Sequence, residues 1–351
     1  MNRKVFLGII TVIFLIVGGM VVIFHPKSMS QNDLRIMLNG DTIMNIDEVY
    51  EEPGYQAIDA IDGDITNQVK VDENINYHVA GTYEIVYSVT NSKGETARVS
   101  RFVILDKVLS YIYKEEYNAI NNAAKSWWSA NKKNQTRPSG GYSYGLLKQY
   151  NATFIGPDEK VIYLTFDEGG NQTYVNEIVD VLNQNDVKAT FFLCRGFMLK
   201  NPELIRKIEA TGHSVGNHTT HHLKMSELAT KENFAQYVSE ITDLEKAYFE
   251  ITGKIMDKVY REPKGEWSER SLAIVKDMGY KSFFYSADYL DWNGDVTGDY
   301  AYNELMKRYH NGAIYLIHPQ NKGNYEAMDR FIKEMKRLGY TFGLVRDITI
   351  D

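Results

Sequence analysis

The order of apolar and polar positions divides the chain into parts with three different patterns. Residues 5–24 carry no charge, and residues 35–106 contain short runs in which apolar and polar side chains alternate. Over residues 151–351, strand-like apolar runs take turns with helical ones. These patterns are typical of a membrane span, a β domain and an α/β domain, in that order.

The uncharged stretch at residues 5–24 is long enough to cross the hydrocarbon core of a membrane as a helix. A secretory signal peptide would have a shorter apolar core and a cleavage site with small residues, so we expect an uncleaved transmembrane anchor. Arg3 and Lys4 precede it, and the positive-inside rule therefore makes residues 1–4 a cytoplasmic tail. Residues 25–34 are then a linker, and everything after it lies outside the cytoplasm.

Residues 35–106 form a separate unit. Runs such as 83–89 and 97–104 alternate between apolar and polar side chains, and turn sequences rich in Gly, Pro and Asp separate the runs. Several short strands at this spacing predict a small β-sandwich. The sequences at 52–55 and 80–83 also make the unit resemble the Ig-like modules of Gram-positive surface proteins. That resemblance implies a spacer or wall-contacting domain without chemistry of its own.

Residues 107–150 are expected to hold a helix followed by a connector. Apolar residues recur at helical spacing between residues 106 and 133, which predicts a helix there. Pro138 and the glycines around it predict an irregular connector over residues 135–144.

The part from residue 151 to residue 351 is expected to be a parallel α/β domain, because strand-like and helical runs alternate along it. Helices are predicted at residues 178–184, 204–210, 234–252, 268–278, 300–309 and 325–338. Strands are predicted at residues 161–168, 189–193, 213–217, 259–261, 282–286 and 313–317. No Gly-x-Gly-x-x-Gly turn follows a strand, so the pattern favours a distorted (β/α) barrel over a doubly wound sheet.

Composition excludes several classes of function. The length of 351 residues suits two domains with additional segments, and the net charge of −7 argues against a nucleic-acid partner. Cys194 is the only cysteine, so neither an intrachain disulfide nor a cysteine-based metal site can form. Its apolar surroundings indicate a small buried side chain rather than a nucleophile.

Charged and polar residues follow the predicted strands one after another. Asp167 and Glu168 close the strand at residues 161–168, and two glycines follow them. Catalytic and ligand-binding groups are typically found at this end of parallel strands. An acidic loop without chemistry is the alternative interpretation of the pair.

His218 and His222 are four residues apart, so on one helical turn both imidazoles would face one metal ion. His221 is offset by one position and should point elsewhere. A polar loop is the alternative, but Asp167 and Glu168 supply the carboxylate that a two-histidine metal site still needs.

Two further strand ends carry groups suited to catalysis. Arg261 could clamp a carboxylate, and the turn at residues 263–265 could aim a backbone N–H into the site. His318 closes an apolar strand, and with Asp291 to orient it, it fits a general acid. A surface arginine and a core histidine are the alternatives.

These strand-end motifs together resemble those of the polysaccharide deacetylase family with the NodB-type domain, carbohydrate esterase family 4, over residues 155–351. Within the family, the sequences at residues 162–167, 146–150 and 312–318 are most similar to the PdaA-like, δ-lactam-biosynthetic peptidoglycan deacetylases. The resemblance implies a hydrolase that removes N-acetyl groups from cell-wall polysaccharide with the help of a divalent metal. Zinc is the expected ion, with cobalt or manganese as alternatives.

The resemblance also implies roles for individual residues. His218, His222 and Glu168 would hold the metal, and Asp167 would be the general base, held in place by Arg261. His318, paired with Asp291, would protonate the leaving amine. The remaining predicted groups are the Lys264 backbone N–H for the oxyanion, and Trp292 and Leu316 around the acetate pocket.

The sequence departs from the family pattern in three places. Glu168 stands where the family has aspartate and the PdaA-like members have asparagine, and Glu262 replaces the first proline of an Arg-Pro-Pro motif. Residues 168–174 also differ from the run that follows the base in PdaA-like members.

We therefore expect a monomeric, single-pass membrane enzyme that acts on peptidoglycan glycan strands outside the cell. N-acetylmuramic acid is the expected substrate, N-acetylglucosamine is the alternative, and an inactive cell-wall-binding protein is an alternative of another class. Sporulation and lysozyme resistance employ the same reaction, and the sequence does not choose between them.

Overall fold

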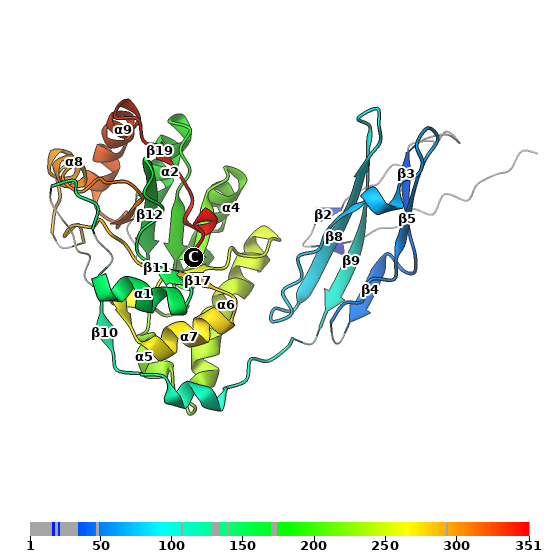
Figure 1. Cartoon of the computed structure of the whole chain (residues 1–351), viewed down its shortest axis with the longest axis horizontal. Coiled ribbons are helices and arrows are strands. Elements are labelled where there is room, and N and C mark those ends of the chain that lie inside the picture. The colour runs from blue at the N-terminus through cyan, green and yellow to red at the C-terminus, as the bar shows by residue number, and fades with distance from the viewer. Residues whose placement is uncertain are drawn as a thin grey trace, which may run out of the picture. The chain divides into compact units, whose positions relative to one another are not determined.

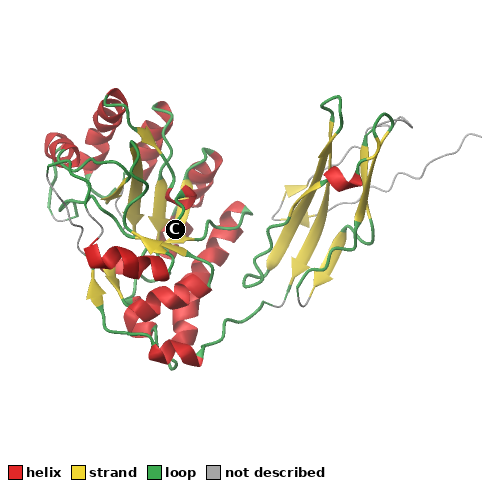
Figure 2. Ribbon diagram, in the orientation of Figure 1, coloured by secondary structure: helices red, strands yellow, loops and turns green. Residues whose placement is uncertain are grey.

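The computed structural model describes residues 16–17, 20–21, 34–46, 49–106, 108–127, 134–138, 141–169, 174–292 and 294–350. The chain divides into two compact units, and the main division falls close to residue 104. Residues 34–106 are almost entirely strands and loops, whereas the residues after 107 combine helices with strands (Figure 2).

Most of the predicted membrane span at residues 5–24 lies outside the described residues, as do the predicted tail and residues 25–33 of the linker. The described part of the span consists of β1 (Ile16–Val17) and β2 (Met20–Val21), which pair antiparallel. Nowhere in the described part of the chain is there a helix long and apolar enough to traverse a bilayer.

The first unit contains two antiparallel sheets, in agreement with the predicted β-sandwich. One sheet has the order β3–β5–β6, from β3 (Arg35–Leu38), β5 (Tyr55–Asp59) and β6 (Gly63–Asp64). The other has the order β4–β9–β8–β7, from β4 (Ile43–Ile46), β9 (Thr96–Leu105), β8 (Gly81–Thr90) and β7 (Lys70–Asp72). A short 3₁₀ helix, η1 (Thr66–Gln68), follows β6. Ala57, Ile65 and Val89 pack together in the interior.

The second unit is built on a parallel sheet with the order β11–β17–β15–β14–β13–β12–β18, and β19 pairs with the start of β12. Its strands are β11 (Ala152–Thr153), β12 (Val161–Glu168), β13 (Thr190–Leu193), β14 (Ser214–Asn217), β15 (Val259–Tyr260), β17 (Lys281–Phe283), β18 (Ala313–Ile317) and β19 (Thr341–Phe342). All the pairs of this sheet are parallel.

The sheet forms a half-barrel, so the predicted distorted (β/α) barrel is realised in part. Its edge strands are β11 and β18, and only single bridges, Ile155–Ala313 and Ala287–Tyr315, connect the two edges. A complete ladder at this seam would require longer strands than β11 and β17, which have two and three residues.

Helices surround the sheet (Figure 1). They are α1 (Gly141–Gln149), α2 (Val175–Gln184), α3 (Arg195–Lys200), α4 (Pro202–Ala210), α5 (Met225–Leu228), α6 (Phe234–Thr252), α7 (Glu269–Asp277), α8 (Gly298–Met306) and α9 (Lys322–Arg337). The predicted helices from residue 178 onward all form, because each has an apolar face that packs on the sheet.

Two predictions for residues 107–150 are wrong. In place of a helix over residues 106–133, the described residues form irregular chain, the 3₁₀ helix η2 (Glu115–Ala119) and strand β10 (Lys125–Ser126). β10 pairs with β16 (Glu266–Trp267), so contacts distant in sequence override the helical spacing. The predicted connector contains the start of α1 instead.

The core of the second unit lies between the sheet and the helices on its outer face. Phe166 on β12 is completely buried and stacks on Phe191 of β13, with ring centroids 5.0 Å apart. We predict that Phe166→Ala lowers the free energy of unfolding by about 3–5 kcal/mol, through lost burial and a residual cavity.

Urea unfolding followed by tryptophan fluorescence measures this change in the second unit alone, because all 4 tryptophans follow residue 107. Leu199→Ala is the matched control, since Leu199 is 47% exposed and its loss should cost less than about 0.5 kcal/mol. Equal midpoints for the two variants would contradict this description of the core.

Candidate active site

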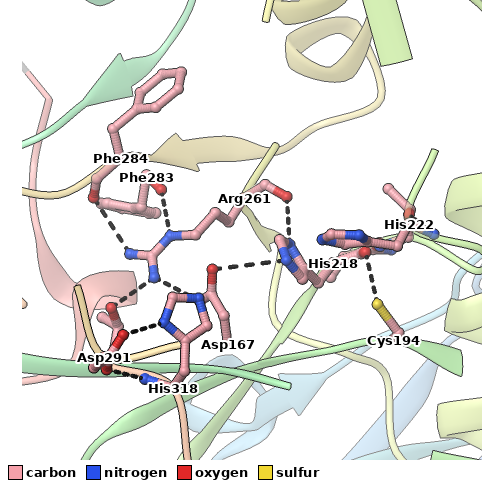
Figure 3. Close-up of polar contacts among 12 residues, drawn as sticks. Asp167, Cys194, His218, His222, Arg261, Phe283, Phe284, Asp291 and His318 are labelled. Carbon is pink, nitrogen blue, oxygen red and sulfur yellow. Dashed lines mark hydrogen bonds and ion pairs between the residues drawn. The ribbon is translucent and has the colours of Figure 1, made fainter. Parts of the chain in front are cut away.

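The polar residues that follow the parallel strands lie together at the carboxyl edge of the sheet. β12 ends with Asp167 and Glu168, His218 follows β14, Arg261 follows β15, and His318 follows β18. Parallel ladders between neighbouring strands bring these ends to the same level. Figure 3 shows Asp167 between Arg261, His218 and His318.

A buried ion pair between Arg261 and Asp167 occupies the centre of this edge. Arg261 Nη1 donates to Asp167 Oδ1 and to Thr165 Oγ1, each at 2.7 Å. The rest of the guanidinium is held by backbone carbonyls, from Nε to Phe283 at 2.9 Å and from Nη2 to Phe284 at 3.3 Å. Arg261 therefore pairs with a carboxylate, that of Asp167, but through one nitrogen and one oxygen rather than in the predicted bidentate clamp.

Phe192, on strand β13, packs against the Arg261 side chain. The guanidinium carbon lies 4.2 Å from the centroid of the Phe192 ring. A side chain at Gly216, on the neighbouring strand β14, would meet that ring at 2.5 Å and Val259 at 3.0 Å. Glycine is therefore required at residue 216 if Phe192 is to lie flat beneath Arg261.

The ion pair keeps Asp167 in its charged form. Burial opposes ionisation of the carboxyl, but the charge of Arg261, with smaller contributions from His218 and His318, outweighs it and holds the pKa below its usual value. Asp167 is thus a carboxylate at neutral pH, as a general base must be.

The two histidines of the predicted metal site lie side by side, although no helix carries them. Residues 218–224 form a loop between β14 and α5, so the predicted helical turn is wrong. The loop nevertheless brings the rings of His218 and His222 to a centroid separation of 4.8 Å. His221 points elsewhere, as expected, and its ring nitrogen Nδ1 lies 2.6 Å from Glu240 Oε1.

The His218 ring is oriented by a backbone contact. Its Nδ1 lies 2.9 Å from the Arg261 carbonyl oxygen, which can only accept, so Nδ1 carries the proton. Nε2 then has the free lone pair in the neutral ring, 3.6 Å from Asp167 Oδ2. A carbonyl that fixes the tautomer in this way is typical of metal-binding histidines.

Both imidazoles are suited to binding a metal, because burial keeps them neutral. Burial lowers the pKa of His218 despite the neighbouring Asp167 carboxylate. The pKa of His222 falls to about 4 through burial and the proximity of His218. Metal ions bind the neutral ring, so the pair fits a divalent metal.

Glu168 does not join His218 and His222 as the predicted third metal ligand. Successive side chains of a strand point to opposite faces, and Asp167 shares its face with Thr165. Glu168 therefore belongs to the opposite face of β12, with the core residues Leu164 and Phe166. Within the described part of the chain, no three His, Cys, Asp or Glu side chains converge as a metal site.

His318 and Asp291 form a second acid–base pair. His318 Nδ1 lies 2.7 Å from Asp291 Oδ1, and the His318 backbone N–H donates to Oδ2 at 2.7 Å. Asn324 also donates to Oδ2, at 2.8 Å. Burial opposes protonation of the ring, but the hydrogen bond and the charge of Asp291 outweigh it and raise the pKa of His318 above 6.5.

A groove of about 1010 Å³ opens beside this pair. The residues that line it include Tyr174, Asn201, Trp292, Thr297, Asn321 and Lys322. Asn321 Nδ2 donates to the Asp291 carbonyl oxygen at 3.3 Å, which joins the groove wall to the His318–Asp291 pair. Trp292 lines the groove and is 59% exposed.

The two remaining predicted residues lie near the site. Lys264 is exposed on the 3₁₀ turn η3 (Pro263–Gly265) with φ of 60°, and its charge contributes to the lowered pKa of His222, after burial and His218. Leu316 lies on β18 opposite Thr165. The oxyanion and acetate-pocket roles stay predictions.

Cys194 is buried beneath the loop and donates from Sγ to the His218 carbonyl oxygen at 3.3 Å. Burial raises the pKa of its thiol, in keeping with the predicted structural role. Sequence reasoning missed Thr165 and Asn324. Thr165 could have been found, because it lies two residues before Asp167 and so on the same strand face, whereas nothing marks Asn324.

Comparison with known proteins identifies the family. The model for polysaccharide deacetylases matches residues 155–283, and that for the Ig-like domain of bacterial surface proteins matches residues 36–105. The peptidoglycan-N-acetylmuramic acid deacetylase PdaA of Bacillus subtilis (strain 168) is 35% identical over 237 residues, which cover 66% of this chain and 89% of PdaA. The chain therefore belongs to the polysaccharide deacetylase family, whose members are generally metal-dependent hydrolases.

The structure of the same relative and the sequence of a second one support this assignment. The structure of Bacillus subtilis PdaA, a family 4 carbohydrate esterase, has a TM-score of 0.61 at 34% identity and covers 65% of this chain and 97% of that one. A peptidoglycan-N-acetylglucosamine deacetylase of Bacillus cereus is 30% identical over 204 residues, which cover 57% of this chain and 72% of that protein.

Asp291→Asn is predicted to move the alkaline limb of the pH profile of kcat/KM to lower pH. Because Asp291 raises the pKa of His318, the proton-donating form of His318 persists above pH 6.5 and is lost as the pH rises through that pKa. Without the carboxylate, the loss should occur at lower pH.

Acetate release from purified peptidoglycan, measured across pH, checks this. Asp299→Asn is the control, because Asp299 is 88% exposed and pairs with Arg330 on the surface. An alkaline limb that stays in place in Asp291→Asn would remove Asp291 from its assigned role.

Proposed function

We propose that this protein hydrolyses the N-acetyl groups of peptidoglycan amino sugars, and that N-acetylmuramic acid is its main substrate. One observation carries the proposal. A carboxylate kept ionised by Arg261 and an imidazole whose pKa is raised by Asp291 meet at one sheet edge, next to two neutral histidines. Metal-assisted amide hydrolysis uses this set: a base for water, an acid for the amine, and ligands for a Lewis acid.

A residue of the site can be assigned to each proton transfer of the reaction. Asp167 takes a proton from the attacking water, whose oxygen bonds to the acetamide carbonyl carbon. His318 then donates its proton to the nitrogen as the C–N bond breaks, and acetate and the free amine leave. The Lys264 backbone N–H would stabilise the developing oxyanion, and Trp292 and Leu316 would enclose the acetyl methyl group.

His218 and His222 would hold a divalent metal, which would act as a Lewis acid on the acetamide carbonyl and lower the pKa of water. Zinc is the proposed ion, since neutral imidazole is one of its preferred ligands, and cobalt or manganese are the alternatives. The neutral state of both rings and the fixed tautomer of His218 support this assignment.

The choice of N-acetylmuramic acid rests on the relatives. The one named for that sugar is more similar to this chain and aligns over more of it than the one named for N-acetylglucosamine. N-acetylglucosamine is the alternative substrate. An inactive wall-binding protein is disfavoured, because Asp167, His218, His222 and His318 are all in place.

The groove beside His318 suits a polysaccharide. An exposed indole next to amide and hydroxyl side chains is the chemistry that binds sugar rings, which have an apolar face and a rim of hydroxyl groups. Residues 5–24 would anchor the monomeric enzyme in the cell membrane with the catalytic unit outside, where its substrate lies. The Ig-like domain would then be a spacer within the wall.

Asp167→Asn and His318→Ala are predicted to reduce acetate release from purified peptidoglycan by at least about 10²-fold, since each removes a proton-transfer group. Glu203→Gln, at an 86% exposed side chain, should retain wild-type activity. Mass spectrometry of the digested muropeptides identifies the deacetylated sugar. Activity in both active-site variants would disprove the mechanism, and loss of acetyl groups from glucosamine alone would select the alternative substrate.

Exhaustive chelation is predicted to abolish acetate release, and added Zn²⁺ or Co²⁺ to restore it, because the carbonyl loses the Lewis acid that polarises it. His218→Ala should also bind less zinc than wild type when metal content is measured by mass spectrometry. Full activity after chelation would show that the histidine pair does not bind a catalytic metal.

A further inference from the structure

The loop that carries the two metal-binding histidines adopts an unfavourable backbone. Thr219 has φ of 69° and His222 has φ of 57°, both in the left-handed region. This region is uncommon for any residue with a side chain, and for a β-branched threonine it is a genuine outlier. Such backbone is energetically unfavourable and persists only where neighbouring structure enforces it.

Helix α6 provides this enforcement at the middle of the loop. The carboxylate of Glu240 accepts from the His221 backbone N–H at 2.7 Å and lies 2.6 Å from His221 Nδ1. The Glu240 backbone carbonyl accepts from Thr220, at 2.9 Å from N and 3.1 Å from Oγ1. One residue of α6 thus holds two consecutive loop residues, which lie between the two histidines.

The same turn of α6 also reaches the start of the loop. Asn217 Nδ2 donates to the Ile241 carbonyl oxygen at 3.1 Å, and Asn217 Oδ1 accepts from the Thr219 backbone N–H at 2.9 Å. His222 N–H in turn donates to Thr219 Oγ1 at 3.0 Å. The strained residues are therefore tied to each other and, through Asn217, to α6.

We propose that Glu240 is a positioning residue for metal binding, which holds His218 and His222 together through its contacts with His221. The proposal rests on the metal site of the proposed function. Glu240 contacts the loop through His221. The side chain of His221 is 68% exposed, whereas that of Glu240 is 2% exposed.

A carboxylate is the group that this role requires. Its two oxygens accept from two donors at once, the His221 N–H and the His221 ring N–H. Glutamine has one acceptor oxygen and no charge, so it could keep the ring contact only if its amide N–H donated to a deprotonated His221 Nδ1, and alanine would keep neither contact. Burying a carboxylate costs free energy unless its oxygens are hydrogen-bonded, and the contacts with His221 offset this cost for Glu240.

Zinc affinity, measured by competition with a chromophoric chelator, tests the proposal. Loss of groups that orient metal ligands typically weakens binding by about 10–100-fold. We expect this loss in Glu240→Ala, a smaller one in Glu240→Gln, and none in Glu250→Ala. Glu250 is on the same helix and makes only a surface contact of 4.0 Å with Lys246.

The visible spectrum of the Co²⁺-loaded protein is the second readout, because its bands report ligand geometry rather than stability. The bands should change in Glu240→Ala and recover partly in Glu240→Gln. If Glu240→Ala does not fold, His221→Ala removes the ring contact from the exposed side, keeps the backbone N–H contact, and should give a smaller shift of the same kind.

The outcomes separate this proposal from the function on which it rests. Zinc affinity and Co²⁺ bands that match wild type in the Glu240 and His221 variants would overturn the positioning role and leave the metal site intact. A wild-type protein that binds neither metal would overturn both.

Discussion

Arg261 is the residue on which the whole site depends, because it fixes two functional groups at once. Its guanidinium pairs with Asp167, and its backbone carbonyl orients the His218 ring. The ion pair is buried, so its desolvation must be offset by further hydrogen bonds, which Thr165 and two backbone carbonyls supply. Removing either partner would leave a buried charge unpaired, at a cost of about 3–5 kcal/mol.

The fold explains why these groups can meet. The strands of the half-barrel are short, and the charged and imidazole side chains of the site come where β12, β14, β15 and β18 leave the sheet. Since the strands are parallel and in register, residues far apart in the chain reach one edge. The base is held by Arg261, directly after β15, and the acid by Asp291, in the loop between β17 and α8, so the pKa of Asp167 is lowered while that of His318 is raised.

Most helices and strands of the second unit could be predicted from the sequence, because the spacing of hydrophobic residues along the chain reflects the local conformation. Helix α6 and strand β18 have the predicted bounds, and Asp167, His218, Arg261 and His318 meet as expected. The failures come from distant contacts. β10 exists because β16 pairs with it, and the histidine loop is held by α6 rather than by its own helical hydrogen bonds. Glu240 lies on a helix whose amphipathic pattern already accounted for it, so nothing marked it as functional.

The acid limb of the pH profile in an Arg261→Gln variant tests the central claim most directly. Arg261→Lys, which keeps a positive charge, is the comparison. If Arg261 holds Asp167 ionised, acetate release from peptidoglycan should be lost at higher pH in Arg261→Gln than in wild type, because the pKa of the carboxyl rises without its partner. An acid limb at the same pH in all three proteins would show that Asp167 is not the base that Arg261 controls.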